Sequence, residues 1–431
     1  MTAANPPITP AAPVVTTEIG LAERKAIRAA RIRGAIFVIV GLLALQAATQ
    51  SFNDPVEFRF WVDKQGGQAW SIATSVGLLW LLFGISSGIV GMLQLVYTTR
   101  FPWRRALLLL VPLFIAALLG ALLAGKPANL TGVFRGSLEF AVPISLGAFA
   151  GILSERSGML NIAIEGKFLL GACAAAVVSS ITGQAIAGII AAMVVGVGVG
   201  YLLAWLAIRH NVDQIITGIV INIGALGITN FLFLRVLSKN TQLNTPAVID
   251  PLKLPVLSEI PVIGPILFTG TPYLYFTLGL MVFLTYMMFR TRWGLRLRAS
   301  GEKPSAAGTV GIDVIKIRYR AMILAGICAG IAGSYLSLVS GGSFQMGMSA
   351  GRGFIALAAV IFGAWHPVFA FGAALVFGFA DATQALLSIL GVDVPPQVLN
   401  SVPYVVTIVV VAGVVGRVRG PAAAGQPYDQ G

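Results

Sequence analysis

Charged residues lie inside apolar stretches of the sequence at two places. Arg135 and Glu139 are four residues apart, so on a helix they share one face and can form an ion pair. Asp381, followed by Gln384, has no cation on its own apolar stretch. Such groups face a bundle interior or a polar cavity, because charge within a membrane is costly. We therefore expect a structural ion pair at Arg135, and at Asp381 either the aqueous end of a helix or a polar cavity.

Polar, glycine-rich segments interrupt the apolar pattern twice. Segment 154–166, with Asn161 and Glu165, joins two apolar runs. It predicts a broken or re-entrant helix lining a cavity, with a plain cytoplasmic turn as the alternative, because membranes tolerate irregular backbone only where protein or water surrounds it. Segment 341–353 leads into another apolar run and, by the count of crossings, opens to the opposite side, as in an inverted repeat.

Two motifs of soluble enzymes occur in unsuitable surroundings. Residues 120–126 have the spacing of a phosphate-binding loop, but Pro127 replaces the magnesium-binding Ser or Thr, so we expect no ATPase on this chain. Residues 84–88 read G-x-S-x-G, which suggests an intramembrane serine protease. A serine nucleophile needs a base, and His210 and His366 lie at a predicted helix end and beside a proline. Packing of small residues explains the pentapeptide more simply.

The composition indicates a membrane protein. Of 431 residues, 57% are hydrophobic and 10% charged, whereas soluble domains carry roughly 25% charged residues. This excludes an ordinary soluble enzyme, a disordered protein and a nucleic-acid-binding domain. The net charge of +13 comes from basic clusters between apolar runs, as in cytoplasmic loops. Cys173 and Cys328 are too few for a disulfide framework or a four-ligand zinc site.

Apolar runs of about 20 residues predict transmembrane helices, because backbone polar groups in hydrocarbon must be satisfied within the segment. We expect an all-α polytopic transmembrane bundle of about 10–12 spans, with broken or re-entrant segments. The expected spans are 34–50, 71–97, 106–124, 131–152, 163–181, 184–208, 214–236, 273–289, 321–340, 353–364, 368–390 and 402–416. With twelve crossings the arginine-rich loops and both termini share one side, which the positive-inside rule makes cytoplasmic.

The basic loop 290–320 is too long for a turn and too short for a domain. Pro304 favours the start of a short helix, Ala306 and Ala307 continue it, and Gly311 ends it. Such a short helix, protruding from the loop, could serve as a docking site for a cytoplasmic partner. A solvated basic loop, the alternative, would need the arginines but not the Ala-Ala-x-x-x-Gly pattern.

The chain resembles the membrane permeases of bacterial ABC importers, and among these the nucleoside and simple-sugar permeases, relatives of the ribose and branched-chain amino acid permeases. The similar segments are Ser154–Gly166, Gly294–Ile312, Ile317–Arg320, Ala329–Leu336 and Gly353–Pro367. The resemblance covers about residues 128–418. The first three spans lie outside it, and Gly308 stands where members of the family often have a bulkier polar residue.

The resemblance implies the division of the chain and its location in the bacterial plasma membrane. The expected parts are a disordered Pro/Ala-rich and basic cytoplasmic N-terminus (1–33), an extension of about three spans (34–127), the permease core (128–418) and a cytoplasmic tail (419–431). It also implies a second, usually different, permease, two ATP-binding subunits and an extracellular substrate-binding lipoprotein. ATP and Mg then belong to the partner subunits, and this chain carries no cofactor.

In this family the cytoplasmic loop couples to the ATPase, which implies that role for Gly301, Glu302, Ala306, Ala307 and Gly311. A nucleoside needs hydrogen-bonding groups and an aromatic surface, because each polar edge that loses water needs a partner. The expected substrate-path residues are Asn161, Glu165, Asn222, Phe344, Gln345, Asp381 and Gln384. The preference for a nucleoside over ribose or another simple sugar rests on the resemblance.

Two other classes of function stay open at this point. A proton-coupled secondary transporter would use Glu139 or Asp381 as its proton site. An intramembrane protease would depend on Ser86 of the G-x-S-x-G pentapeptide.

Overall fold

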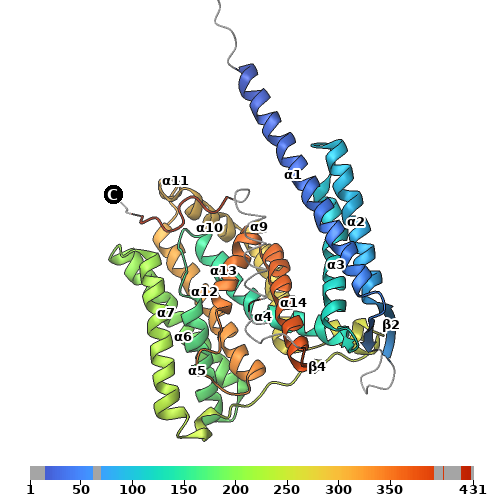
Figure 1. The fold of residues 1–431 in the computed structure, drawn as a ribbon. Helices are drawn as coiled ribbons and strands as arrows, with labels where there is room; N and C mark the ends of the chain where they lie inside the picture. The colour runs from blue at the N-terminus through green and yellow to red at the C-terminus, as the bar shows by residue number, and fades with distance from the viewer. Residues whose placement is uncertain (1–14, 62–68, 393–400, 402–418, 429–431) are drawn as a thin grey trace, which may run out of the picture. The chain divides into compact units, whose positions relative to one another are not determined.

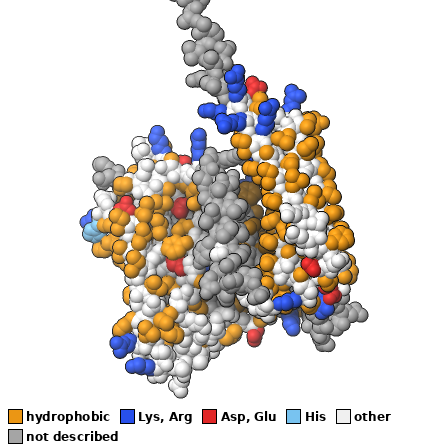
Figure 2. All heavy atoms as spheres, viewed as in Figure 1, with side chains coloured by type: hydrophobic (Ala, Val, Ile, Leu, Met, Phe, Trp, Pro, Cys, Tyr) orange, Lys and Arg blue, Asp and Glu red, His pale blue; other side chains and the backbone are white. Residues whose placement is uncertain are grey.

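The computed structural model describes residues 15–61, 69–392, 401 and 419–428. Contacts between residues divide the chain into an N-terminal unit, residues 1–59 and 70–128, and a main unit, residues 60–69 and 129–431. Most of the described chain is helical (Figure 1). Figure 2 shows hydrophobic side chains over the visible faces of both units.

Ten helices among the described residues are long and apolar enough to cross a membrane, which confirms the predicted all-α polytopic bundle. The N-terminal unit contains α1 (Val15–Gln50), α2 (Val76–Tyr97) and α3 (Trp103–Leu122). The main unit contains α4 (Leu130–Glu155), α5 (Ile164–Thr182), α6 (Ala185–Arg209), α7 (Gln214–Leu232), α9 (Pro272–Arg290), α12 (Val314–Tyr335) and α14 (Pro367–Ile389). α7 and α12 end in π-helical turns, η1 (Phe233–Leu237) and η4 (Leu336–Ser340).

Two of the twelve expected spans have a different outcome. The run 353–364 forms α13 (Arg352–Phe362), whose 11 residues are about 16 Å long, roughly half the thickness of the hydrocarbon layer. α13 is therefore too short to cross alone, and it follows the irregular segment 341–351. The run 402–416 lies outside the described residues.

The N-terminal unit corrects one expectation about the start of the chain. α1 begins at Val15, so residues 15–33, expected to be disordered, are helical. The Ala, Glu, Lys and Arg residues of 22–31 are strong helix formers, which accounts for the difference. Strands β1 (Pro55–Trp61), β2 (Ala69–Ser75) and β3 (Pro127–Asn129) form a sheet in the order β2-β1-β3.

The G-x-S-x-G pentapeptide lies within α2 and packs against α1. Gly84 is in close contact with the backbone of Gly41, and the Ser87 hydroxyl donates to the Phe37 carbonyl at 2.8 Å. His210 and His366 belong to the main unit. These contacts support the packing interpretation of the pentapeptide.

Shorter elements connect the spans of the main unit. Between α7 and α9 lie η2 (Thr241–Asn244), η3 (Leu257–Glu259), α8 (Ile263–Leu267) and an antiparallel pair, β4 (Leu252–Lys253) with β5 (Thr269–Gly270). In β4 and β5, Leu252 pairs with Gly270. Between α9 and α12 lie α10 (Arg292–Glu302) and α11 (Pro304–Thr309).

Glycines bring α6 and α12 into direct backbone contact. Gly196 of α6 faces the carbonyl of Gly326, and Gly330 faces the carbonyl of Ala192. A Cβ atom at any of these glycines would overlap backbone atoms of the other helix. Small residues permit this close approach, and van der Waals packing then holds the helices together where lipid offers no hydrophobic driving force.

Replacing one interface glycine therefore tests this packing. We expect Gly196→Ala to destabilise the protein by about 1–3 kcal/mol, the usual cost of overpacking, because neither backbone can yield without moving a helix. Gly198→Ala is the matched control, since Gly198 lies on the same helix with no atom near its Cβ position. Thermal unfolding of both variants in detergent would measure the difference, and equal midpoints would contradict the close contact.

Candidate functional site

A buried break separates α4 from α5. α4 ends at Glu155 and α5 begins at Ile164, and between them Gly158 adopts φ +92°, a left-handed conformation that favours glycine. Ser157 and Asn161 in this break are fully buried. The segment therefore joins two helices that are each long enough to span a membrane, and it is packed against protein rather than exposed.

Glu165, just after the break, holds the N-terminal end of α13. Its Oε1 accepts hydrogen bonds from the Ser349 hydroxyl (2.6 Å) and the Gly351 N–H (2.9 Å), and its Oε2 accepts one from the Gly353 N–H (2.7 Å). Glu165 itself is buried. A carboxylate is favourable at a helix N-terminus, where the free N–H groups and the helix dipole carry partial positive charge.

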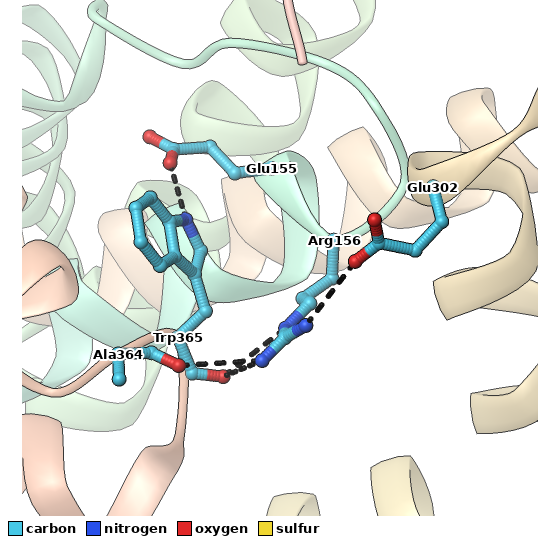
Figure 3. A network of polar contacts seen from close by, with 5 residues as sticks. All are labelled: Glu155, Arg156, Glu302, Ala364 and Trp365. Atoms are coloured by element: carbon cyan, nitrogen blue, oxygen red, sulfur yellow. Dashed lines mark hydrogen bonds and ion pairs between the residues drawn. The ribbon is translucent and has the colours of Figure 1, made fainter. Parts of the chain in front are cut away.

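Arg156, at the other end of the break, holds the C-terminal end of α13 (Figure 3). Its guanidinium donates to the carbonyls of Ala364 and Trp365, each at 3.3 Å, and lies 3.9 Å from the Glu302 carboxylate. The Trp365 indole donates to Glu155 at 2.6 Å. Burial lowers the pKa of Arg156 from its ordinary value, while Glu302 opposes this shift. The break thus places a negative charge, Glu165, at the N-terminal end of α13 and a positive charge, Arg156, just beyond its C-terminal end. The helix dipole favours this arrangement.

Asp381 of α14 pairs with a cation from a different helix. Its carboxylate lies 3.7 Å from Nε of Arg352, the first residue of α13, and Arg352 also donates to the Met348 carbonyl at 3.3 Å. This ion pair explains how a buried carboxylate is accommodated on a helix without its own cation. Gln384 lies one turn further along α14 and is partly buried.

The expected ion pair between Arg135 and Glu139 is wrong. Glu139 accepts hydrogen bonds from the N–H (2.6 Å) and hydroxyl (2.7 Å) of Thr271 and from the Tyr335 hydroxyl (3.1 Å). Among the ion pairs of the described residues, none joins Glu139 to Arg135. Thr271 precedes α9, so Glu139 binds the start of a neighbouring helix, where the helix dipole favours a carboxylate.

Asn161 and Asn222 fasten the break to its neighbours. Asn161 accepts a hydrogen bond from Lys167 Nζ at 2.7 Å. Asn222 of α7 accepts one from the Gly166 N–H (2.7 Å) and donates one to the Ile162 carbonyl (2.9 Å). Sequence reasoning missed the fully buried Lys167, although a lysine within an apolar run was a signal of an interior position.

Phe344 and Gln345 line a depression of about 430 Å³ at the end of α7. The Asn244 side chain fixes its wall, accepting from the Phe344 N–H at 2.7 Å and donating to the Phe344 carbonyl at 2.9 Å. The remaining lining residues are Phe233, Ser343 and Met346. The depression combines an apolar wall with amide and hydroxyl groups, the usual composition of a site for a small polar ligand.

The predicted short helix in loop 290–320 is present as α11. Pro304 lies in its first turn, and Gly311 follows its end with φ +78°, a conformation that L side chains rarely adopt. Ala307 is buried, whereas Ala306 is exposed and available to a partner.

The residues before α11 contact the break between α4 and α5. Gly301 lies so close to the Arg156 carbonyl that a side chain would not fit, and Glu302 forms the ion pair with Arg156. A displacement of α11 can therefore reach α13 through Glu302 and Arg156.

The tail residues 419–428 lie against the same surface. The N–H of Ala423 donates to the Gly301 carbonyl at 2.9 Å, and that of Gly425 donates to the Gly158 carbonyl at 3.1 Å. The Tyr428 hydroxyl occupies the space beside Gly308 of α11, so the missing side chain at that position has a structural reason.

Buried Arg318 of α12 anchors this tail. It donates to the Gln426 carbonyl at 3.1 Å, and its guanidinium lies 5.7 Å from the centre of the Tyr428 ring. Sequence reasoning missed both Arg318 and the tail, because neither shows an intramembrane signal of its own.

Glu165→Ala would leave the Ser349 hydroxyl and two backbone N–H groups of the α13 entry unpaired inside the protein. Each hydrogen bond to a charged group contributes about 1.5–3 kcal/mol, so we expect α13 to open locally far more often. Hydrogen exchange followed by mass spectrometry should show lost protection in 349–356. Glu302→Ala, at a largely exposed carboxylate, is the control and should leave that segment protected; protection retained in both variants would contradict the capping role.

Comparison with known proteins places this architecture in a family. The family described as "Branched-chain amino acid transport system / permease component" matches residues 135–412, which begin just after the N-terminal unit. No solved structure matches the chain.

Three relatives are matched over nearly their whole length. The guanosine ABC transporter permease protein NupQ of Bacillus subtilis is 36% identical, over 68% of this chain and 95% of its own length. The nucleoside ABC transporter permease protein NupC of Lactococcus lactis is 35% identical, over 68% of this chain and 94% of its own length. The putative glucose ABC transporter permease protein TsgC13 of Haloferax volcanii is 30% identical, over 69% of this chain and 98% of its own length.

The ten apolar helices indicate a multi-pass membrane protein, and together with the permease relatives they support a place in the plasma membrane as a permease subunit of an ABC transporter. On the strength of a match that covers more than half of it, the chain belongs to the family of permease components of the branched-chain amino acid transport system.

Proposed function

We propose that this permease subunit provides the path for a nucleoside in an ATP-driven importer. The observation that carries the proposal is the similarity to permeases of guanosine and other nucleosides over nearly their entire length. A simple sugar is the alternative substrate. Its support is the similarity to TsgC13, which is lower than the similarity to the two nucleoside permeases. On this proposal ATP and Mg bind to partner ATPases, a lipoprotein delivers the solute, and a second permease completes the path.

Coupling would start at α11, the short helix whose exposed Ala306 faces away from the core. The ion pair between Glu302 and Arg156 joins this segment to the break, and Arg156 binds the end of α13. ATP would drive transport if the closed ATPases bind one arrangement of α11 and α13 better than the other, since only differential affinity shifts such an equilibrium. The expected orientation puts α11, the tail and both termini in the cytoplasm.

The solute would first meet the depression that Gln345 lines at the end of α7. Its amide and hydroxyl groups suit the base edge and ribose of a nucleoside, and its apolar wall suits the flat face of the base. The deeper candidates Glu165, Asn222 and Asp381 are already bound to protein groups. Asn161 accepts from Lys167, and its amide nitrogen is buried without a hydrogen-bond partner among the described residues.

A proton-coupled transporter, the competing class, would need a carboxylate that gains and loses a proton during transport. Glu139 accepts three hydrogen bonds and Asp381 is paired with Arg352, so both carboxylates already hold neighbouring helices together in this structure. These contacts favour the ATP-driven mechanism.

Uptake by a strain that lacks the gene, compared with the complemented strain, tests the substrate and the energy source. We expect labelled guanosine or adenosine to enter only the complemented strain, with unlabelled nucleosides competing and ribose and glucose not competing. Uptake should stop when ATP is depleted and continue when the proton gradient is dissipated while ATP persists. Competition by the sugars would favour the sugar alternative, and dependence on the proton gradient would refute the ABC mechanism.

Ala306→Trp tests the coupling helix without disturbing the core, because Ala306 is exposed. Overpacking an interface costs about 1–3 kcal/mol, so co-purification of the ATPase subunits should fall about tenfold. Gln242→Trp is the control, an exposed position at the far end of α7. If the ATPase co-purifies fully with the Ala306→Trp variant, α11 is not part of the docking surface.

A further inference from the structure

The N-terminal unit lies outside the residues that the family matches, and it carries a built pocket at one end. The pocket has a volume of about 410 Å³ between α1, the turn after α2 and the start of α3. Its polar lining consists of Arg33, Thr98, Thr99, Trp103, Arg104 and Arg105. None of the pocket's lining residues carries a carboxylate, so the pocket concentrates positive charge.

The arginines are arranged around one indole ring. The guanidinium of Arg33 lies 5.0 Å, and that of Arg104 5.8 Å, from the centre of the Trp103 ring. These cation–π contacts restrain the guanidinium groups of both arginines. The Nε of Arg33 is buried without a hydrogen-bond partner among the described residues. A guanidinium held in this way has donors to offer, and its fork geometry matches the oxygens of a phosphate group.

The backbone of the pocket also favours an anion. α3 begins here after Pro102 without a side-chain cap; the N–H groups of Trp103 and Arg105 donate to backbone carbonyls, and the positive end of the helix dipole faces the pocket residues without a carboxylate. Thr98, a lining residue, adopts φ +45°, a conformation that costs energy for a residue other than glycine. Neither feature defines a site alone, but both add to the arginines around Trp103.

The pocket lies where the apolar part of the unit begins. Ile36 of α1 and Leu108 and Leu109 of α3 are largely exposed, and they follow the pocket residues along the same helices. Figure 2 shows Lys and Arg side chains gathered at one end of this unit, with hydrophobic side chains covering the face below them. A ligand held by the arginines would therefore have an aliphatic surface beside it, as the acyl chains of a lipid require.

We infer that this pocket binds the phosphate of an anionic phospholipid headgroup, whose acyl chains lie along α1 and α3. The arginines would bind the phosphate oxygens, Thr98 and Thr99 would donate to the headgroup, and Trp103 would lie at the boundary between headgroups and hydrocarbon. The N-terminal unit then gives the permease a lipid preference. This inference is independent of the solute proposed above.

Native mass spectrometry of the full chain, released from detergent with phosphatidylglycerol or phosphatidylcholine, tests the site. Wild type should retain phosphatidylglycerol in preference to phosphatidylcholine. Because each arginine near an anionic surface contributes about 1 kcal/mol, the triple variant R33Q/R104Q/R105Q should lose at least about tenfold in phosphatidylglycerol retention.

The control is R24Q/R31Q/R100Q, which removes the same number of charges from the same end of the unit, two from α1 and one from the turn before α3, at residues outside the pocket lining. It should stay within about twofold of wild type, since diffuse attraction alone would weaken both variants equally. Equal losses in the two variants, or no preference for phosphatidylglycerol in wild type, would overturn the inference.

Two further measurements separate the source of the phosphate and the effect of misfolding. Soluble sn-glycerol 3-phosphate should not displace the lipid; displacement at similar concentration would identify a site for free phosphate compounds instead. If the triple variant fails to fold, Arg33→Lys keeps the charge but removes the planar fork and should still lower retention. Unchanged retention in Arg33→Lys would leave only a diffuse basic surface and contradict the site.

Discussion

The opposite charges at the two ends of α13 are the constraint on which the main unit depends. Glu165 and Arg156 flank one short break in the chain. Glu165 binds N–H groups at the start of the half-helix, and Arg156 binds the carbonyls of Ala364 and Trp365 just after its end. A half-helix ends inside the protein, so its terminal groups cannot rely on water. Since removing one partner of a buried charge costs several kcal/mol, the break and α13 must move together or exchange partners together.

The helices of the main unit contact one another in two physically different ways. α6 and α12 meet through glycine backbones, a contact that tolerates almost no displacement. The break instead meets α7, α10 and the ends of α13 through hydrogen bonds and ion pairs, as in the bonds of Asn222 to Gly166 and of Arg156 to Glu302. Directional polar contacts have discrete alternatives, so rearrangement is easier at the break than between the glycine-packed helices.

The sequence alone predicts the elements better than their partners. Apolar runs locate the spans, Pro304 and Gly311 locate α11, and the polar residues of 154–166 locate the break, because these features depend on neighbours along the chain. Partners across helices leave no such pattern. The spacing rule that paired Arg135 with Glu139 could not know that Thr271 begins a helix beside Glu139, nor that Arg352 would supply the cation for Asp381.

The bonding of the deep candidates also limits where a solute can be recognised. Glu165 has three donors bound, and both polar atoms of the Asn222 side chain are used, so either could bind a solute only by releasing the break or α13. Releasing a buried polar group costs about 1–3 kcal/mol, which a weakly held solute would have to supply. Among the described residues, no hydrogen bond to another protein group involves the side chain of Gln345 or Ser343, and both line the depression. Binding the solute at the depression they line therefore requires the least free energy to break existing protein contacts. Weak contacts beyond the depression would favour passage, because a path must release what it binds.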